Sequence, residues 1–206
     1  VAGDVDPKAV LELAKTYYGP LAPSDRIKPR LRPSEPPQLA ERRLVLADER
    51  VAQPYVMRSY LAPERNSGDQ KEAAAISILA ELLGGSGTTS VLARALQFDT
   101  QTAVYTSAYY DGTSVDADTF GLVVMPAPNV SLADAEAALD KVLARFLKDG
   151  VNPDDFARIK TQIRASEIYA RDDAMGLAQK YGKALSVGLT VDDVKSWPDV
   201  LQSVTP

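Results

Sequence analysis

Six of the 14 prolines of this chain fall within one short segment, PLAPSDRIKPRLRPSEPP, residues 20–37. Proline fixes φ and lacks an N–H donor, so this density excludes a helix and favours an extended backbone. The segment therefore divides the chain into three parts. We expect a terminal strand and helix of a preceding half-domain over 1–21, a proline-rich basic linker over 22–40, and a C-terminal α+β domain, truncated at its end, over 41–206.

The linker carries four alternating cationic residues, Arg26, Lys28, Arg30 and Arg32. They can be interpreted as a basic docking strip for a partner, which would make the chain an adaptor, or as a solvated tether between domains. No aromatic residue accompanies the charges, and charges without aromatics are typical of a solvated segment. The tether is the favoured interpretation.

The residues before the linker have the pattern of one short strand and one helix. The helix is expected to start at Asp6 followed by Pro7, since aspartate caps the first turn and proline suits the first helical position. Apolar residues recur at helical spacing from Val10 onwards, and Gly19 is a natural stop.

The part after the linker alternates between strands and helices. RRLVLADE and QPYVMRSYLA have the composition of two strands and are expected to form an antiparallel pair. A helix follows within NSGDQKEAAAISILAELLGG, capped by Ser67 or Asp69, and its expected apolar face is Ala74, Ile78, Leu79 and Leu82. A short helix over Val91–Gln97 and two strands, TAVYTSAYYDG and ADTFGLVVMPA, come next.

Helices fill the remainder of the chain. One is expected from the cap Ser131 to Gly150, and a long one from Asn152 that breaks near 171–173. A last helix is capped by Thr190 and is expected to be interrupted or shortened by Pro198. This order predicts an α+β fold with a mainly antiparallel sheet flanked by helices.

The composition excludes several kinds of function. The chain has no cysteine and no histidine, so it lacks thiolate and imidazole metal ligands and cannot form a Ser-His-Asp triad. Its net charge of −5 argues against nucleic-acid binding. No apolar run approaches the roughly 20 residues of a membrane span. We therefore assign no catalytic residue, metal ligand or cofactor to this chain.

The glycine-rich run GGSGTTS could be a phosphate-binding loop or a hinge. No Lys-Ser or Lys-Thr follows the glycines, and the run follows an expected helix, whereas phosphate-binding loops follow a strand. The hinge interpretation is favoured, with Thr88, Thr89 or Ser90 capping the next helix.

The tyrosine-rich run after it could line a binding wall or pack within a sheet. Strand alternation puts Ala103, Tyr105, Ser107 and Tyr109 on one face. Val104, Thr106, Ala108 and Tyr110 are expected on the other.

The order of these segments resembles the pitrilysin and mitochondrial processing peptidase family of zinc metallopeptidases, which carry an inverted His-x-x-Glu-His motif. The resembling segments are VAGDVDPKAVLELAKTYYGPL, RRLVLADERVAQPYVMRSYLAP, GDQKEAAAISILAELLGGSGTTSVLARAL, TAVYTSAYYDG and GLTVDDV. The resemblance implies one half of a duplicated clamshell subunit that closes around extended peptides. It identifies this chain with the C-terminal half, which lacks the zinc, and implies zinc in an N-terminal half outside this sequence.

The resemblance also implies places for substrate contacts. Family members have an arginine on the helix after the glycine turn and a tyrosine seven residues later, and here Gln97 and Val104 take those places. Arg94 shares the helical face of Gln97, and Tyr110 has the strand parity of Val104. A displaced substrate contact from Arg94 and Tyr110 is one interpretation, and a plain chamber wall is the other. Tyr105 is adjacent to Val104 but is expected on the opposite face.

The function implied is a catalytically inactive peptide-chamber wall of a zinc peptidase. Its implied partners are the N-terminal half-domain, an extended peptide and a second subunit in a homo- or heterodimer. The alternative is a structural subunit like the core proteins of the respiratory bc1 complex. The chain starts at Val1 without methionine, so we expect a fragment that does not hydrolyse peptides alone. Secreted bacterial members of the family point to the bacterial periplasm or envelope.

Overall fold

A computed structural model describes residues 1–206 except 27, 29–30, 34–35 and 86. Its α-helices are α1 (Pro7–Tyr18), α2 (Lys71–Ala80), α3 (Leu132–Asp149), α4 (Pro153–Tyr169), α5 (Ala174–Ser186) and α6 (Val191–Ser203). Its strands are β1 (Val56–Ala62), β2 (Ala103–Tyr110) and β3 (Asp118–Pro126). Two π-helical segments, η1 (Glu81–Gly85) and η2 (Ala93–Asp99), and the 3₁₀ turn η3 (Ala170–Asp172) complete the elements.

The strands form an antiparallel sheet in the order β1-β3-β2. The expected α+β class is thus confirmed, but one expected strand pair is wrong. Residues 41–48 form no strand, and Leu44, Val45 and Leu46 are largely exposed. β1 pairs instead with β3, from Val56 opposite Val124 to Ala62 opposite Asp118. The apolar run in RRLVLADE suits a strand, but it specifies no neighbouring strand, and β1 pairs with β3 instead.

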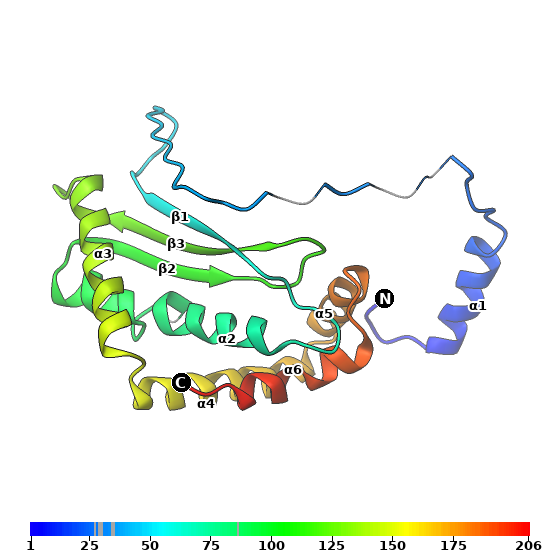
Figure 1. Ribbon diagram of the computed structural model, residues 1–206. Coiled ribbons are helices and arrows are strands. Elements are labelled where there is room, and N and C mark those ends of the chain that lie inside the picture. The colour runs from blue at the N-terminus through cyan, green and yellow to red at the C-terminus, as the bar shows by residue number, and fades with distance from the viewer. Residues whose placement is uncertain (27, 29–30, 34–35, 86) are drawn as a thin grey trace.

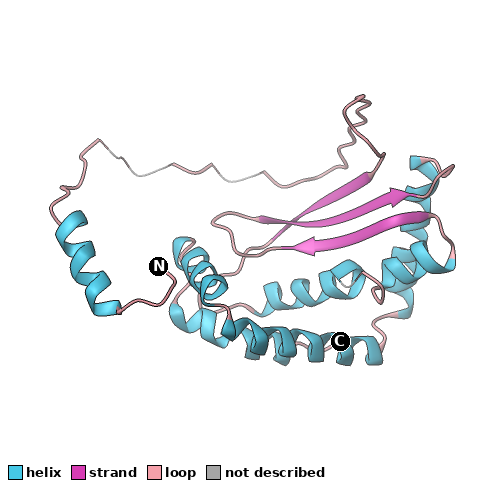
Figure 2. Cartoon of the chain, turned by 180° about the vertical axis from the view of Figure 1, so that it is seen from behind, coloured by secondary structure: helices cyan, strands magenta, loops and turns pink. Residues whose placement is uncertain are grey.

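Apart from α1, the helices gather on one side of this sheet, as Figures 1 and 2 show from opposite sides. α3 crosses one end of the strands, α2 lies beneath them, and α4 and α6 form a further layer below α2. The side chains of Leu122 and Val124 point from β3 into the helical layer and are fully buried. Among the described residues, no helix lies on the opposite face.

Two apolar clusters hold the layers together. The first joins the sheet to η2 and α3: Leu83, Leu92, Ala95, Leu96, Ala103, Ala108, Leu122, Val124, Ala135, Leu139 and Val142. The second joins α2 to α4 and α6: Ala73, Ala74, Ile78, Leu82, Phe156, Ile159, Trp197 and Leu201. The expected apolar face of α2 is confirmed, because Ala74, Ile78 and Leu82 are buried and Leu79 packs against the first cluster.

Local signals place the helix ends as expected. Asp6, Ser131, Asn152 and Thr190 each accept a hydrogen bond from a backbone N–H of the first turn that follows them. The helix that starts after Asn152 breaks at η3, within the expected stretch. Two further expectations are wrong. Residues 1–5 form no strand, and α6 continues through Pro198. The buried Trp197 and Leu201 on either side of this proline anchor α6 to the second cluster, which offsets the lost backbone hydrogen bond.

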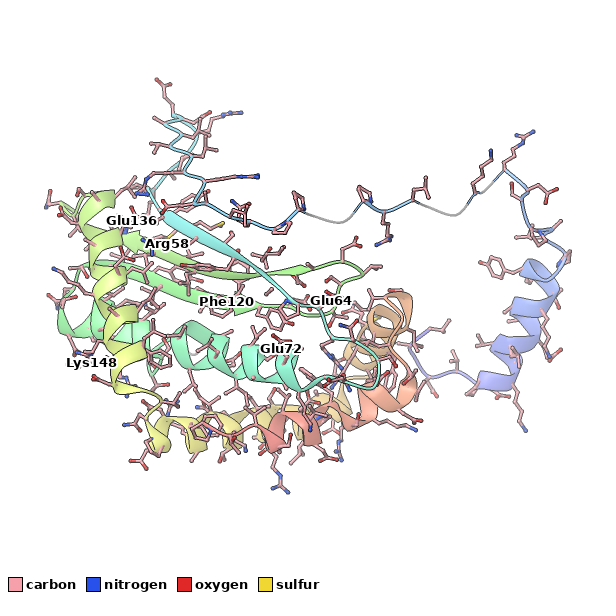
Figure 3. The ribbon with its side chains drawn as sticks, in the orientation of Figure 1. Arg58, Glu64, Glu72, Phe120, Glu136 and Lys148 are labelled. Carbon is pink, nitrogen blue, oxygen red and sulfur yellow. The ribbon has the colours of Figure 1, made fainter. Side chains whose placement is uncertain are left out.

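An ion-pair network ties β1 to α3 on the helical side. Arg58 of β1 donates to Glu136 (Nη2–Oε1, 3.0 Å) and to Asp140 (Nη1–Oδ1, 2.5 Å). Figure 3 shows Arg58 and Glu136 facing each other where α3 passes the strand. Glu136 also pairs with Arg43, which fastens the segment before β1 to the same helix.

The glycine-rich turn is a packing contact. Gly84 lies so close to β2 that a Cβ atom there would be 2.1 Å from the backbone nitrogen of Ala108 and 2.5 Å from the carbonyl carbon of Ser107. The helical layer reaches the strand this closely only because Gly84 has no side chain. Ser90 then accepts a hydrogen bond from the backbone N–H of Ala93, as expected of a hinge residue before the next helix.

Gly84→Ala is expected to lower the free energy of unfolding by about 3 kcal/mol, because a backbone obstacle cannot rotate out of the way. Urea denaturation of the two chains measures the difference. Gly87→Ala is the matched control, since a Cβ there meets no atom within 4 Å, and we expect a change of no more than about 0.5 kcal/mol. Equal losses in the two variants would contradict the packing role of Gly84.

Asp193 connects the start of α6 to the loop before α2. Its buried carboxylate accepts hydrogen bonds from Ser67 Oγ (2.7 Å), the backbone nitrogen of Gly68 (3.0 Å), and both the backbone nitrogen (2.8 Å) and Oγ1 (2.7 Å) of Thr190. These donors favour the ionised form, so the pKa of Asp193 lies well below its usual range, with the Thr190 hydroxyl as the largest cause. Ser67, expected as a cap of α2, instead binds this carboxylate.

Asp193→Asn is expected to cost about 2 kcal/mol at neutral pH, because an amide replaces a charged acceptor. Since the pKa is lowered in the folded state, the contribution is complete above the unfolded value of about 3.9 and is lost as pH falls through the folded value. The gap between wild type and variant should therefore shrink between pH 7 and pH 3 in urea titrations. Asp192→Asn, on the exposed neighbour, should leave stability nearly unchanged; a gap that widens toward low pH would rule out this account.

The helix α1 stands apart from the rest of the fold. None of its residues is buried, and Leu11, Leu13, Tyr17 and Tyr18 are largely exposed. The division into segments 1–21, 22–40 and 41–206 stays a prediction. Among the described residues, no helix has both the length and the apolar character needed to cross a membrane.

Candidate functional site

The uncovered face of the sheet is the most distinctive surface of the described structure. Its exposed side chains include Met57 and Leu61 of β1, 52% and 56% exposed, and Tyr105 and Tyr109 of β2, 49% and 41% exposed. They share this face by register, since Met57 and Ser107 both oppose Val123, while Tyr109 opposes Gly121. We call this set, Met57, Ser59, Leu61, Tyr105, Ser107, Tyr109, Thr119, Gly121, Val123 and Met125, the open face.

Tyr109 spans the centre of the open face. Its ring lies across Gly121, where an added Cβ would be 2.1 Å from the ring carbon Cζ. Its hydroxyl reaches Met57 Sδ on β1 at 4.0 Å, a weak hydrogen bond across the middle strand. The ring is therefore held flat against the sheet and forms an aromatic platform that an extended ligand could contact.

A bulge in β2 decides which residues reach this face. The register shifts between Ala103, opposite Pro126, and Tyr105, opposite Met125. Ala103 is consequently buried on the helical side, so its expected place beside Tyr105 is wrong. Val104 is the extra residue and is half exposed, while Tyr105 is the first paired residue on the open face.

Arg94 lies on the helical side, at the joint between η2 and α4. Its guanidinium pairs with Asp155, which also accepts from Arg158 at 2.9 Å and lies in the first turn of α4. Burial opposes ionisation of Asp155, but the hydrogen bonds from the two arginines outweigh it, so its pKa lies below the usual range. Arg94 lines a cavity of about 470 Å³ there, together with Arg145 and Asp99.

Gln97 and Tyr110 are also engaged within the fold. Gln97 Nε2 donates to Thr106 Oγ1 at 2.7 Å, and Thr106 is a buried residue of β2 on the helical side of the sheet. The Tyr110 hydroxyl donates to the carbonyl oxygen of Pro63, and desolvation raises its pKa to about 12. The structure thus keeps Arg94, Gln97 and Tyr110 on the helical side and Val104 at the bulge, and does not bring the four together. Their role in substrate binding stays a prediction.

The described residues offer no fitting site for the zinc that the family resemblance implies. The sequence contains no histidine and no cysteine, and the described residues include no group of three acidic side chains that could hold a metal ion. We therefore assign no catalytic step to a metal held by this chain.

Comparison with known proteins now identifies the family. The profile of the Peptidase M16 inactive domain matches residues 1–163. The chain belongs to this family. It is the C-terminal, inactive-domain half of the pitrilysin-type zinc protease architecture, as the segment order predicted. None of the curated proteins matches the chain.

Solved structures share the fold of this M16 inactive domain. A protease from Helicobacter pylori superimposes with a TM-score of 0.86 at 22% identity over 99% of this chain, but this is 48% of that protein. The inactive peptidase domain of a putative zinc protease from Bordetella parapertussis gives 0.62 at 15% identity over 75% of this chain and 80% of its own. An M16 inactive domain from Pseudomonas fluorescens gives 0.58 at 18% identity, with 73% and 35% coverage. The chain thus spans about half of the Helicobacter protein.

The sequence alone did not identify Tyr105 and Tyr109 as surface residues of one face with Met57 and Leu61. The alternation in AVYTSAYY correctly placed Tyr105 with Tyr109, but it could not show which face the helices cover. Residues 122–125 of β3 are apolar on both faces, so the sequence does not show which face the helices cover. The burial of Leu122 and Val124 settles this only in the folded structure.

Proposed function

We propose that this M16 inactive domain forms one wall of a peptide-binding chamber, facing a zinc site carried by an N-terminal half. The observation that carries the proposal is the open face: an apolar, aromatic sheet surface left uncovered, while the opposite side packs against the helices through Leu122 and Val124. An exposed apolar surface of this kind marks a site of interaction. Its ligand would be an extended peptide, whose side chains can contact Tyr105, Tyr109 and Met57.

The bulge in β2 changes which residue corresponds to the substrate-binding tyrosine of the family. Counted without the extra residue, the place seven positions after Gln97 belongs to Tyr105 instead of Val104. Tyr105 stands half exposed on the open face, which suits a hydrogen bond from its hydroxyl to a peptide carbonyl. We therefore propose Tyr105 as the tyrosine of this wall. Arg94 would contribute only if it left Asp155.

A second candidate is a structural subunit of the same fold, without a peptide ligand. Two observations support this candidate. Arg94 is paired with Asp155, and Gln97, which stands where family members have their substrate-binding arginine, is uncharged and bonded to Thr106. The two candidates differ in whether the open face binds peptide.

Peptide binding tests the proposal directly. Fluorescence anisotropy of a labelled, unstructured peptide of about 20 residues is expected to show saturable binding. Tyr105→Ala and Tyr109→Ala should each weaken it about five- to tenfold, because each removes an aromatic contact worth about 1 kcal/mol. Tyr169→Ala, an exposed tyrosine at the end of α4, is the matched control and should bind as wild type does.

Equal affinities for wild type, Tyr105→Ala and Tyr169→Ala would remove the open face as the binding surface. Absence of any peptide binding would favour the structural subunit. Arg94→Ala tests whether Arg94 contacts the peptide. If the variant binds peptide with unchanged affinity and is only less stable, Arg94 is a structural residue.

Metal content gives an independent prediction. The purified chain is expected to retain no stoichiometric zinc after dialysis and to show no zinc-dependent hydrolysis of an unfolded peptide, since it has no imidazole or thiolate ligand. Metal analysis and a peptide-cleavage assay with added zinc measure both. Zinc-dependent turnover by the chain alone would overturn the assignment of the catalytic site to another half.

A further inference from the structure

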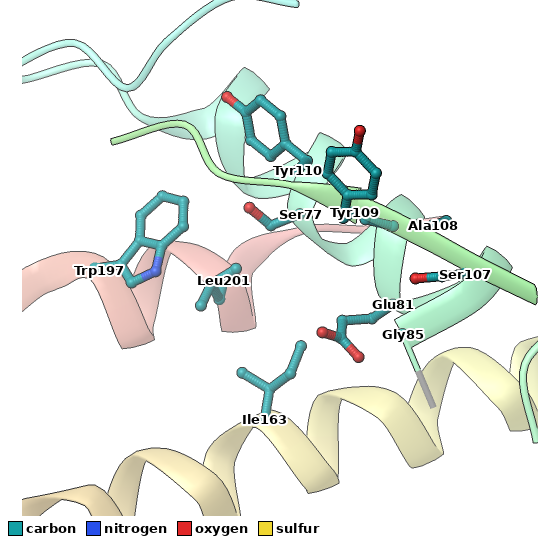
Figure 4. A pocket seen from close by; sticks show the side chains of 11 residues that line it. Ser77, Glu81, Gly85, Ser107, Ala108, Tyr109, Tyr110, Ile163, Trp197 and Leu201 are labelled. Atoms are coloured by element: carbon teal, nitrogen blue, oxygen red, sulfur yellow. The ribbon is translucent and has the colours of Figure 1, made fainter. Parts of the chain in front are cut away.

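A cavity of about 360 Å³ lies beside β2, between the helical layers. Its walls come from α2 and η1 on one side, β2 above, and α4 and α6 below, as Figure 4 shows. Ser107 and Tyr109, whose side chains lie on the open face, also border this cavity, so the cavity adjoins the edge strand β2. A peptide that passes over this edge could place one side chain in the cavity.

Glu81 is the only charged side chain among the described residues that line this cavity. Figure 4 shows its carboxylate pointing into the space between α4, represented by Ile163, and β2. The carboxylate lies against Gly85, where an added Cβ would be 2.1 Å from Oε2, so the glycine makes room for it. Glu81 is an exposed residue, but partial desolvation of its carboxylate raises its pKa.

Two of the other polar groups of the cavity already have partners. Ser77 Oγ donates to the carbonyl oxygen of Ala73 at 2.8 Å, and the Tyr110 hydroxyl donates to that of Pro63. The remaining wall is mainly apolar, with Ala80, Ala108, Ile163, Trp197 and Leu201. Arg65 covers a face of the Trp197 ring at 3.7 Å and thereby fixes its position. The cavity thus offers one anionic acceptor beside several apolar side chains.

We propose that this cavity binds an organic ammonium ion carried on an aliphatic stem, with Glu81 as its counter-ion. The apolar walls would contact the stem, and the carboxylate would form a charge-assisted hydrogen bond with the ammonium group. A lysine side chain or the free amino terminus of a peptide supplies this chemistry. This inference rests on the proposed peptide-binding function for the source of the ligand, but not for the site itself.

Small probes test the site without a peptide on the open face. In NMR titrations of the full chain, N-acetyl-lysine N-methylamide is expected to shift the amide signals of α2, η1 and β2 around Glu81. The norleucine analogue, which has the stem without the charge, should bind at least about tenfold more weakly, a loss of about 1.4 kcal/mol. Alanine N-methylamide with a free amino group tests the amino terminus as the alternative source.

Glu81→Gln removes the charge and keeps the shape, so it should weaken the lysine probe about tenfold and abolish its preference over the norleucine analogue. Glu72→Gln is the matched control, because Glu72 lies on α2 outside the cavity lining and is exposed. Unchanged thermal unfolding of both variants shows that the fold is intact. Equal binding of the lysine and norleucine probes to wild type, or an unchanged affinity in Glu81→Gln, would overturn the proposal.

The outcomes separate this inference from the proposed function. If the probes leave the Glu81 signals unmoved while the labelled peptide still depends on Tyr105, the cavity site fails and the peptide wall stands. If the lysine probe binds through Glu81 while no peptide binds the open face, the cation site stands and the peptide wall fails.

Discussion

The close approach of Gly84 to the backbone of β2 sets the geometry on which the described fold depends. It brings η1 against the strand at Ala108, so the helical layer and the sheet share one apolar cluster. A side chain at this position would separate the layers and open the core on both sides of η1. The same contact holds Glu81 and Gly85 beside β2, which forms the roof of the adjoining cavity. Packing and the candidate cation site therefore have a common origin.

The one-sided cover of the sheet gives its two faces different roles. The helical side uses its polar groups internally, in pairs such as Arg58 with Glu136 and Gln97 with Thr106. The open face has only one such contact among those described here, the weak hydrogen bond from Tyr109 to Met57. A surface whose polar groups make few intramolecular hydrogen bonds can exchange water for a ligand without breaking contacts within the fold. This is why the proposed function rests on the open face and not on the residues first aligned with the family's arginine and tyrosine.

The sequence predicted what short-range chemistry determines. The caps at Asp6, Ser131 and Thr190 and the apolar face of α2 depend on neighbours within a few residues, and all are present in the structure. The partner of β1 and the bulge before Tyr105 depend on segments far apart in the chain, which alternation alone does not specify. The same reason applies to the candidate site. Strand alternation correctly put Tyr105 and Tyr109 on one face, but only the packing of the helices determines that this face stays exposed.

Two surface ion pairs join the part of the chain between α1 and β1 to the folded domain. Arg32 pairs with Asp116 in the β2–β3 connection, and Arg43 pairs with Glu136 on α3. Exposed pairs weaken as ionic strength rises, whereas the apolar clusters do not depend on charge. Added salt should therefore loosen these two attachments and leave the packing of the sheet on its helices unchanged.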